Sequence, residues 1–270
     1  MNAIGGLRAA SREQLAAVLR HSKGTIAADD AAKALKIDHT AASRLLAGWA
    51  MRGWLARVRR GVFVAVPLES STADIALEDA WVVADRLFAP CYIGGWSAAQ
   101  HWGFTEQLSR SILVFTTRRP RARRVEARGS VFIVRTLKER AMFGLKHVWR
   151  GKTRLQLSDP TRTMVDLLDT PALGGGIRSV IEMLGAYFTS PHADPKLLIR
   201  YADQLGNKAV FKRLGYIASI HIEGPPEIVK ACRARLSAGN AKLDPKLPAE
   251  RLVTAWRLWI PAGFAKDAAR

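Results

Sequence analysis

Residues 38–49, DHTAASRLLAGW, are the most informative stretch for the fold of the N-terminal part of the chain. Its apolar residues, from Ala42 through Leu45 and Leu46 to Trp49, recur at the spacing of an α-helix. Asp38 predicts where the helix begins, because its carboxylate can accept hydrogen bonds from the unpaired N–H groups of the first turn. The remaining polar residues then share the opposite face near the N-terminal end: His39, Thr40, Ser43 and Arg44.

Two further helices are predicted before this stretch, and two strands after it. Leu15, Val18 and Leu19 recur at helical spacing, and Gly24 is suited to stop that helix. A second short helix is expected within residues 25–35. Strands at 54–58 and 62–66 flank Arg59-Arg60-Gly61, where glycine suits a tight turn. Three helices and a hairpin with a basic turn form the order of a winged helix-turn-helix, predicted over residues 1–68.

In helix-turn-helix proteins the N-terminal end of such a helix enters the major groove. Arg44 can pair with two acceptors of guanine, and Thr40 and Ser43 can reach a base or a phosphate. Arginines of the hairpin are expected at the DNA backbone or in the minor groove. The alternative is an ordinary polar helix surface. The predicted DNA contacts are His39, Thr40, Ser43, Arg44, Arg57, Arg59 and Arg60.

Composition favours a globular protein with a polyanionic partner. The chain has 270 residues, 49% of them hydrophobic, which allows two modest domains with normal cores. Its formal net charge is +19, and nucleic acid is the commonest partner of so basic a chain. A solvated basic surface is the alternative explanation.

The two cysteines, Cys91 and Cys232, are too few and too distant for a disulfide scaffold or a zinc site, and they suit a reducing cytoplasm. No apolar run approaches the roughly 18 residues that a membrane span needs. The N-terminus lacks the pattern of a secretion signal. We therefore expect a cytoplasmic protein with no membrane partner.

Residues 67–72 are polar and contain a proline, which predicts a linker. Strands and helices are interspersed beyond it, so residues 73–270 are predicted to form a larger mixed α/β domain. The expected fold class is therefore α+β. Helices are predicted at 73–87, 96–103, 160–168, 177–188, from 195, and at 207–214 with a stop at Gly215. Strands are predicted at 111–117, 131–134, 155–157 and 251–261.

The densest charge lies between two of these strands. Residues 118–154 contain thirteen Lys or Arg and two Glu, a net charge of +11. This strip either contacts a second polyanion, such as flanking DNA or RNA, or is an exposed hairpin that keeps the protein soluble. Its arginines are Arg118, Arg119, Arg121, Arg123 and Arg124.

The sequence contains no strong catalytic motif. Asp159, Asp166 and Asp169 could hold a metal ion for a nuclease, but we expect Asp159 to cap a helix and Asp166 to pair with Arg162 one turn earlier. Residues 174–176 are three glycines without the Lys and Ser/Thr of a phosphate loop, which indicates a turn. The histidines lack the spacing of metal ligands. We predict no catalytic residue, metal or cofactor, and no enzyme activity.

Four segments resemble a known family. They are YIGGWSA at 92–98 with HWGFTEQ at 101–107, SDPTRTMVDLL at 158–168, NKAVFKRLGY at 207–216 and RRGVF at 59–63. Together they resemble the AbiEi family of type IV toxin–antitoxin system antitoxins. The resemblance implies a winged-helix domain joined to a larger antitoxicity domain, repression of the protein's own operon, and opposition to a nucleotidyltransferase-like toxin encoded beside it.

The leading hypothesis is therefore a sequence-specific repressor that binds double-stranded operator DNA and serves as an antitoxin. One alternative is a direct protein–protein inhibitor of a toxin. Others are a stand-alone regulator without a toxin, and a nuclease or RNA-binding factor that uses the arginine strip.

Overall fold

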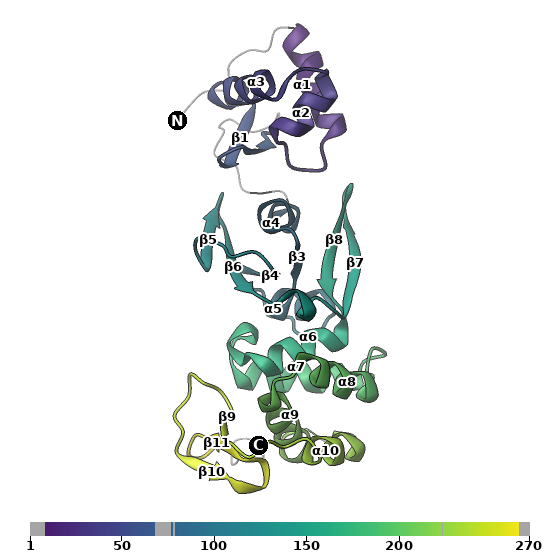
Figure 1. The fold of residues 1–270 in the computed structure, drawn as a ribbon, viewed down its shortest axis with the longest axis vertical. Coiled ribbons are helices and arrows are strands. Elements are labelled where there is room, and N and C mark those ends of the chain that lie inside the picture. The colour runs from purple at the N-terminus through teal and green to yellow at the C-terminus, as the bar shows by residue number, and fades with distance from the viewer. Residues whose placement is uncertain (1–8, 68–76, 78, 223, 265–270) are drawn as a thin grey trace. The chain divides into compact units, whose positions relative to one another are not determined.

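The computed structural model describes residues 9–67, 77, 79–222 and 224–264 (Figure 1). Within these ranges the fold is α+β, as predicted, with ten α-helices and three sheets. The chain forms two compact units. Unit 1 comprises Met1–Cys91, Arg110–Thr136 and His147–Leu155, and unit 2 comprises Tyr92–Ser109, Leu137–Lys146 and Gln156–Arg270. The predicted domain boundary at residues 68–73 lies outside the described residues.

Unit 1 begins with three helices and a hairpin in the predicted order. These are α1 (Ala9–His21), α2 (Ala28–Leu35), α3 (His39–Met51), β1 (Leu55–Arg59) and β2 (Val62–Ala65). The core of this N-terminal module is formed by apolar residues of all three helices and the hairpin, among them Val18, Leu46, Trp49 and Phe63. Ile26, between α1 and α2, exchanges two backbone hydrogen bonds with Phe63. This pairing fixes the hairpin against the helices.

The rest of unit 1 consists of α4 (Ala80–Phe88), three whole strands of a six-stranded sheet and parts of its other three, β3, β7 and β8. The strands of this sheet are β3 (Cys91–Ile93), β4 (Ser111–Thr116), β5 (Arg124–Ala127), β6 (Ser130–Thr136), β7 (Leu145–Arg150) and β8 (Thr153–Ser158), in the order β5-β6-β4-β3-β8-β7. Helix α4 packs on β4. The Thr116 hydroxyl bonds to the carbonyls of Phe88 and Pro90, which ties the end of β4 to the end of α4.

The segment between the predicted strands 111–117 and 131–134 differs from the hairpin considered above. Strands β4 and β6 are parallel, so the chain crosses over between them. The crossover contains the edge strand β5, which pairs antiparallel with β6. β5 was not predicted from the sequence, because the arginines in and before it mask the apolar alternation that indicates a strand.

Unit 2 is mainly helical and has a small sheet. Helix α6 lies at its centre, with Pro160 to Leu168 buried, and contacts α5, α7, α8 and α9. Its helices are α5 (Gly95–His101), α6 (Pro160–Asp169), α7 (Ile177–Thr189), α8 (Pro195–Leu205), α9 (Lys208–Ile220) and α10 (Pro226–Arg233). Its small sheet has the order β10-β11-β9, from β9 (Ala241–Lys242), β10 (Arg251–Val253) and β11 (Leu258–Ile260).

Two predictions in unit 2 are wrong. Gly215 does not end its helix, because α9 continues to Ile220. A Cβ atom at Gly215 would lie 2.0 Å from Cζ3 of Trp256, so this glycine allows the indole ring to pack against the helix. Residues 251–261 do not form one strand. They form β10 and β11, which pair antiparallel around a short 3-10 helix that ends at Trp256.

Candidate nucleic-acid interface

The N-terminal end of α3 has the geometry that the sequence predicts. The Asp38 carboxylate accepts a hydrogen bond of 2.9 Å from the backbone N–H of Ala41, which lowers the pKa of Asp38. Ala42, Leu46 and Trp49 are buried and Leu45 is half-buried, so the apolar face of the helix is fixed in the core. The predicted contact residues His39, Thr40, Ser43 and Arg44 are all exposed on the other face.

One weak contact involves these residues. His39 Nε2 lies 3.7 Å from Asp29 Oδ1, and both side chains are about two-thirds exposed or more, at 66% and 73%. An ion pair between side chains that exposed adds little free energy. Arg52, directly after α3, is a further exposed cation that sequence analysis missed, and its guanidinium lies 5.5 Å from the Trp54 ring centroid.

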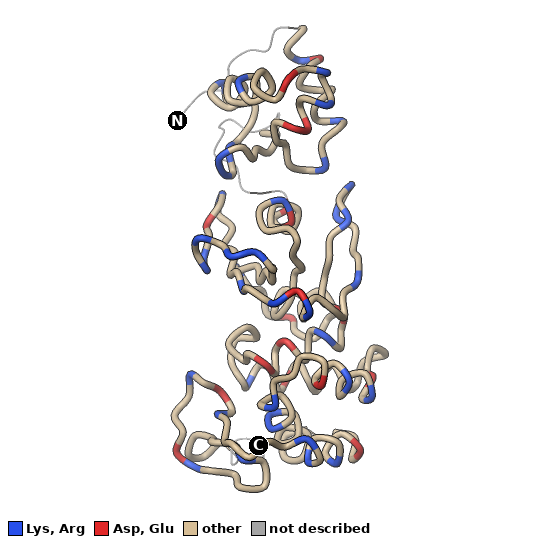
Figure 2. The backbone as a smooth tube through the Cα atoms, in the orientation of Figure 1, with Lys and Arg blue, Asp and Glu red and all other residues tan. Residues whose placement is uncertain are grey.

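The β1–β2 hairpin presents the other three predicted contact residues. Arg57, Arg59 and Arg60 are exposed, and Gly61 has a φ of 78°, which favours glycine. A bulge between Arg57 and Arg59 shifts the register just before the turn. The Arg57 guanidinium lies over the Phe63 ring, with Cζ 5.4 Å from the ring centroid. Figure 2 shows Lys and Arg at this turn and on the segment leading into β5.

All five arginines of the strip are exposed: Arg118, Arg119, Arg121, Arg123 and Arg124. The Arg124 guanidinium pairs with Glu126 at 2.8 Å, which neutralises part of the charge. The strip belongs to the same unit as the N-terminal module. Arg128, in the turn between β5 and β6, donates a hydrogen bond from Nε to the carbonyl of Arg57 at 3.0 Å. This contact between the two basic segments could not be predicted from the sequence, because it joins residues far apart in the chain.

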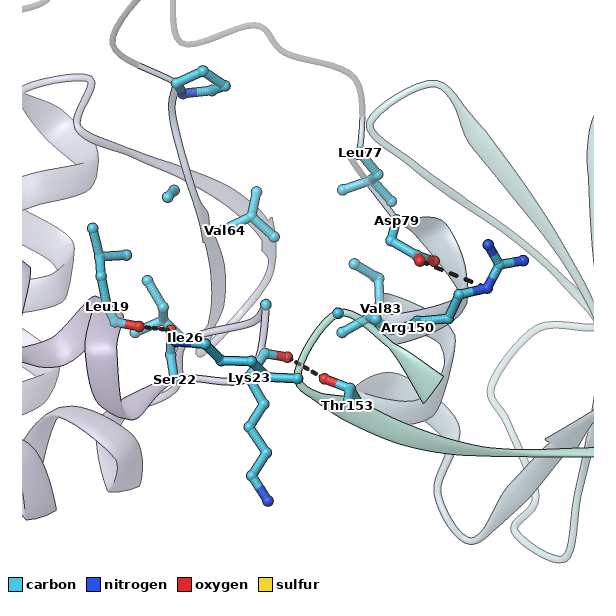
Figure 3. Close-up of a pocket in the computed structure, with 16 residues that line it drawn as sticks. Leu19, Ser22, Lys23, Ile26, Val64, Leu77, Asp79, Val83, Arg150 and Thr153 are labelled. Atoms are coloured by element: carbon cyan, nitrogen blue, oxygen red, sulfur yellow. Dashed lines mark hydrogen bonds and ion pairs between the residues drawn. The ribbon is translucent and has the colours of Figure 1, made fainter. Parts of the chain in front are cut away.

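The N-terminal module contacts the rest of unit 1 through surfaces other than the polar face of α3. The Thr153 hydroxyl donates to the Lys23 carbonyl at 2.7 Å, and Arg86 pairs with Asp30 at 2.9 Å. A cavity of about 510 Å³ lies beside these contacts, with apolar walls that include Leu19 and Val83 (Figure 3). At its edge Arg150 lies 3.9 Å from Asp79. These contacts use the α1–α2 connection and α2, and they leave His39, Thr40, Ser43 and Arg44 exposed.

The aspartates considered as metal ligands have other partners in unit 2. Asp159 caps α6 by accepting from the N–H of Arg162, and it also accepts from the Tyr201 hydroxyl. Asp166 pairs with Arg162 at 2.9 Å, as predicted, and it accepts from the Tyr92 hydroxyl at 3.0 Å. Asp169 accepts from the Asn207 amide. Within the described ranges, no group of three or more His, Cys, Asp or Glu residues could hold a metal ion.

No helix in the described part of the chain is long and apolar enough to cross a membrane.

No protein-family model and no curated protein sequence matches the chain. Its structure is similar to the crystal structure of the RV2827C protein from Mycobacterium tuberculosis, with a TM-score of 0.62 and 16% sequence identity. The similarity covers 95% of this chain and 93% of that chain, so the two proteins share a fold over nearly their whole length.

Proposed function

We propose that this protein is a sequence-specific transcriptional repressor that binds duplex DNA through the N-terminal end of α3. One observation carries the proposal. His39, Thr40, Ser43 and Arg44 stay exposed at the end of a helix whose opposite face is fixed in a core. Side chains at such a helix end meet base edges in the major groove, where arginine pairs best with guanine.

The basic hairpin supports the same proposal in a different role. Arg57, Arg59 and Arg60 follow α3 directly and are exposed, so they are assigned to phosphates or to the minor groove. Contacts of this kind orient a protein on DNA and carry no sequence information by themselves. The arginine strip is assigned to phosphates that flank the operator.

The resemblance to the AbiEi family extends the proposal to a type IV toxin–antitoxin system. In this role the protein represses its own operon and opposes a nucleotidyltransferase-like toxin encoded beside it. The proposal includes no catalysis by this chain.

The experiment measures binding of the full chain to duplex DNA from upstream of its own coding sequence, with excess unrelated duplex as competitor. The proposal expects a preference of at least about a thousandfold, the lower end for specific DNA-binding proteins. Equal affinity for both duplexes contradicts it. Growth during co-expression with the neighbouring gene product tests the antitoxin part separately. If the protein binds its operator but does not restore growth during co-expression, the supported function is that of a stand-alone regulator.

A further inference from the structure

The hairpin formed by β7 and β8 carries a tryptophan that faces solvent. Trp149 is 68% exposed. Residues two apart on a strand share a face, so His147 lies on the same side as Trp149. Arg154, on β8, lies 3.0 Å from the His147 ring, from Nη2 to Nδ1, so its side chain reaches this face too. We call the exposed surface of His147, Trp149 and Arg154 the Trp149 face.

The opposite side of the same hairpin is anchored. The Arg150 guanidinium lies 4.3 Å from the Trp81 ring centroid and 3.9 Å from the Asp79 carboxylate. Thr153 is buried and bonds to the carbonyl of Lys23 (Figure 3), and Leu155 is also buried. Because these contacts hold the hairpin from one side, the Trp149 face is presented on a fixed element. A preorganised side chain loses less entropy when it binds a ligand.

The β7–β8 hairpin carries charge of one sign. Residues 145–158 include Lys146, Arg150, Lys152 and Arg154, and no Asp or Glu, and Arg154 brings this charge to the Trp149 face. The matching ligand is therefore an anion. An exposed indole beside an arginine fits a nucleic-acid strand in particular, since bases stack on aromatic rings while cations contact the phosphates. Bases within a duplex are stacked on one another, so this contact requires unpaired bases.

We propose that the Trp149 face binds single-stranded nucleic acid, with Trp149 stacked on a base and Arg154 at an adjacent phosphate. The site is separate from the duplex interface on α3 and does not depend on it. It adds a second nucleic-acid activity to the chain.

Fluorescence anisotropy of labelled 12-nucleotide oligo(U) and oligo(dT) with the full chain tests the site. Trp149→Ala is expected to weaken binding by about fivefold to 150-fold, the range for the loss of one base stack. Trp149→Phe keeps an aromatic ring and is expected to retain most of the affinity. Arg154→Ala is expected to reduce the salt slope by about 0.7, the value for one phosphate of a single strand. Leu108→Ala removes another exposed apolar side chain, 83% exposed, and is the matched control with unchanged binding.

Two results overturn the proposal. The first is wild-type affinity of Trp149→Ala for both oligonucleotides; if the variant also loses a co-purifying protein, the face is a protein-docking surface. The second is an equal loss for oligonucleotides and for duplex DNA, since the site is then not specific for single strands. An oligonucleotide of abasic sites is expected to bind the wild type and Trp149→Ala equally. Arg44→Ala is expected to leave single-strand binding unchanged, which separates this site from the duplex interface.

Discussion

Arg128 donates a hydrogen bond of 3.0 Å from Nε to the carbonyl oxygen of Arg57, and so joins the β5–β6 turn to the base of the β1–β2 hairpin. The base of the hairpin is further held by the backbone pairing of Phe63 with Ile26. Its tip, with Arg59 and Arg60, is exposed. The tip is therefore a cationic turn on a supported base, which suits contacts with phosphates.

Replacing Arg59 and Arg60 together by alanine is expected to weaken binding to every duplex by a similar factor. Each lost phosphate contact lowers the slope of log affinity against log salt by about 0.9, so the double variant lowers it by about 2. The affinities for an operator duplex and for an unrelated duplex are measured at several salt concentrations between about 50 and 200 mM, and they give this slope. Arg12→Ala on α1 is the control for loss of an exposed arginine. A loss confined to the operator contradicts the phosphate role.

Arg162→Met is expected to lower the free energy of unfolding by about 3–5 kcal/mol, because it leaves the buried Asp166 carboxylate without its cation. Both side chains are nearly inaccessible, at 0% and 3% exposed. The double variant Arg162→Met, Asp166→Leu removes both charges and is expected to recover most of the loss. Urea unfolding of the three proteins measures these differences. A double variant as unstable as the single one means that the ion pair itself stabilises unit 2.

The same pair predicts a pH dependence. Burial raises the pKa of Asp166 to about 6, which exceeds the lowering by Arg162 and Tyr92. The folded chain therefore keeps a proton that an unfolded Asp loses near pH 4, and this contribution to stability is full below about pH 4 and lost as the pH rises to about 6. Wild type should lose stability relative to Asp166→Asn across this window. Unfolding curves of both proteins at several pH values test it, and parallel profiles contradict it.

Gly215→Ala is expected to destabilise unit 2 by about 1–3 kcal/mol, because the added methyl group must displace the buried Trp256 ring. Gly48→Ala, within α3, is the matched control. Its Cβ meets no atom within 4 Å, so we expect a gain of about 0.5–1 kcal/mol from helix propensity. Thermal or urea unfolding compares the two variants. Equal effects of the two substitutions contradict the packing explanation.

Features fixed by neighbouring residues could be predicted from the sequence. Asp38 and Asp159 cap their helices through bonds three residues ahead, and Arg162 meets Asp166 one helical turn later. Features that depend on distant residues could not. Gly215 resembles a helix stop until Trp256 is placed against it. The parallel pairing of β4 with β6 likewise joins residues distant in sequence. Strand β5 pairs with the adjacent β6, and it could not be predicted because its arginines mask the apolar alternation.

The same distinction applies to the candidate interface. The exposure of His39, Thr40, Ser43 and Arg44 follows from the helical period of the apolar residues around them, and the structure agrees. Arg128 was missed because its contact with Arg57 crosses from one sheet to another. Trp149 was missed because no strand was predicted at residues 145–150, and only the fold shows that it lies exposed on β7.

The most direct test of the duplex interface is the operator preference of Arg44→Ala. Affinities for the upstream duplex and for an unrelated duplex are measured at one salt concentration, for wild type and variant. Loss of one bidentate base contact is worth about 1–3 kcal/mol, so operator affinity should fall about fivefold to 150-fold while affinity for the unrelated duplex changes little. An Arg44→Ala protein that binds and discriminates the operator as well as wild type would contradict the assignment of α3 to the major groove.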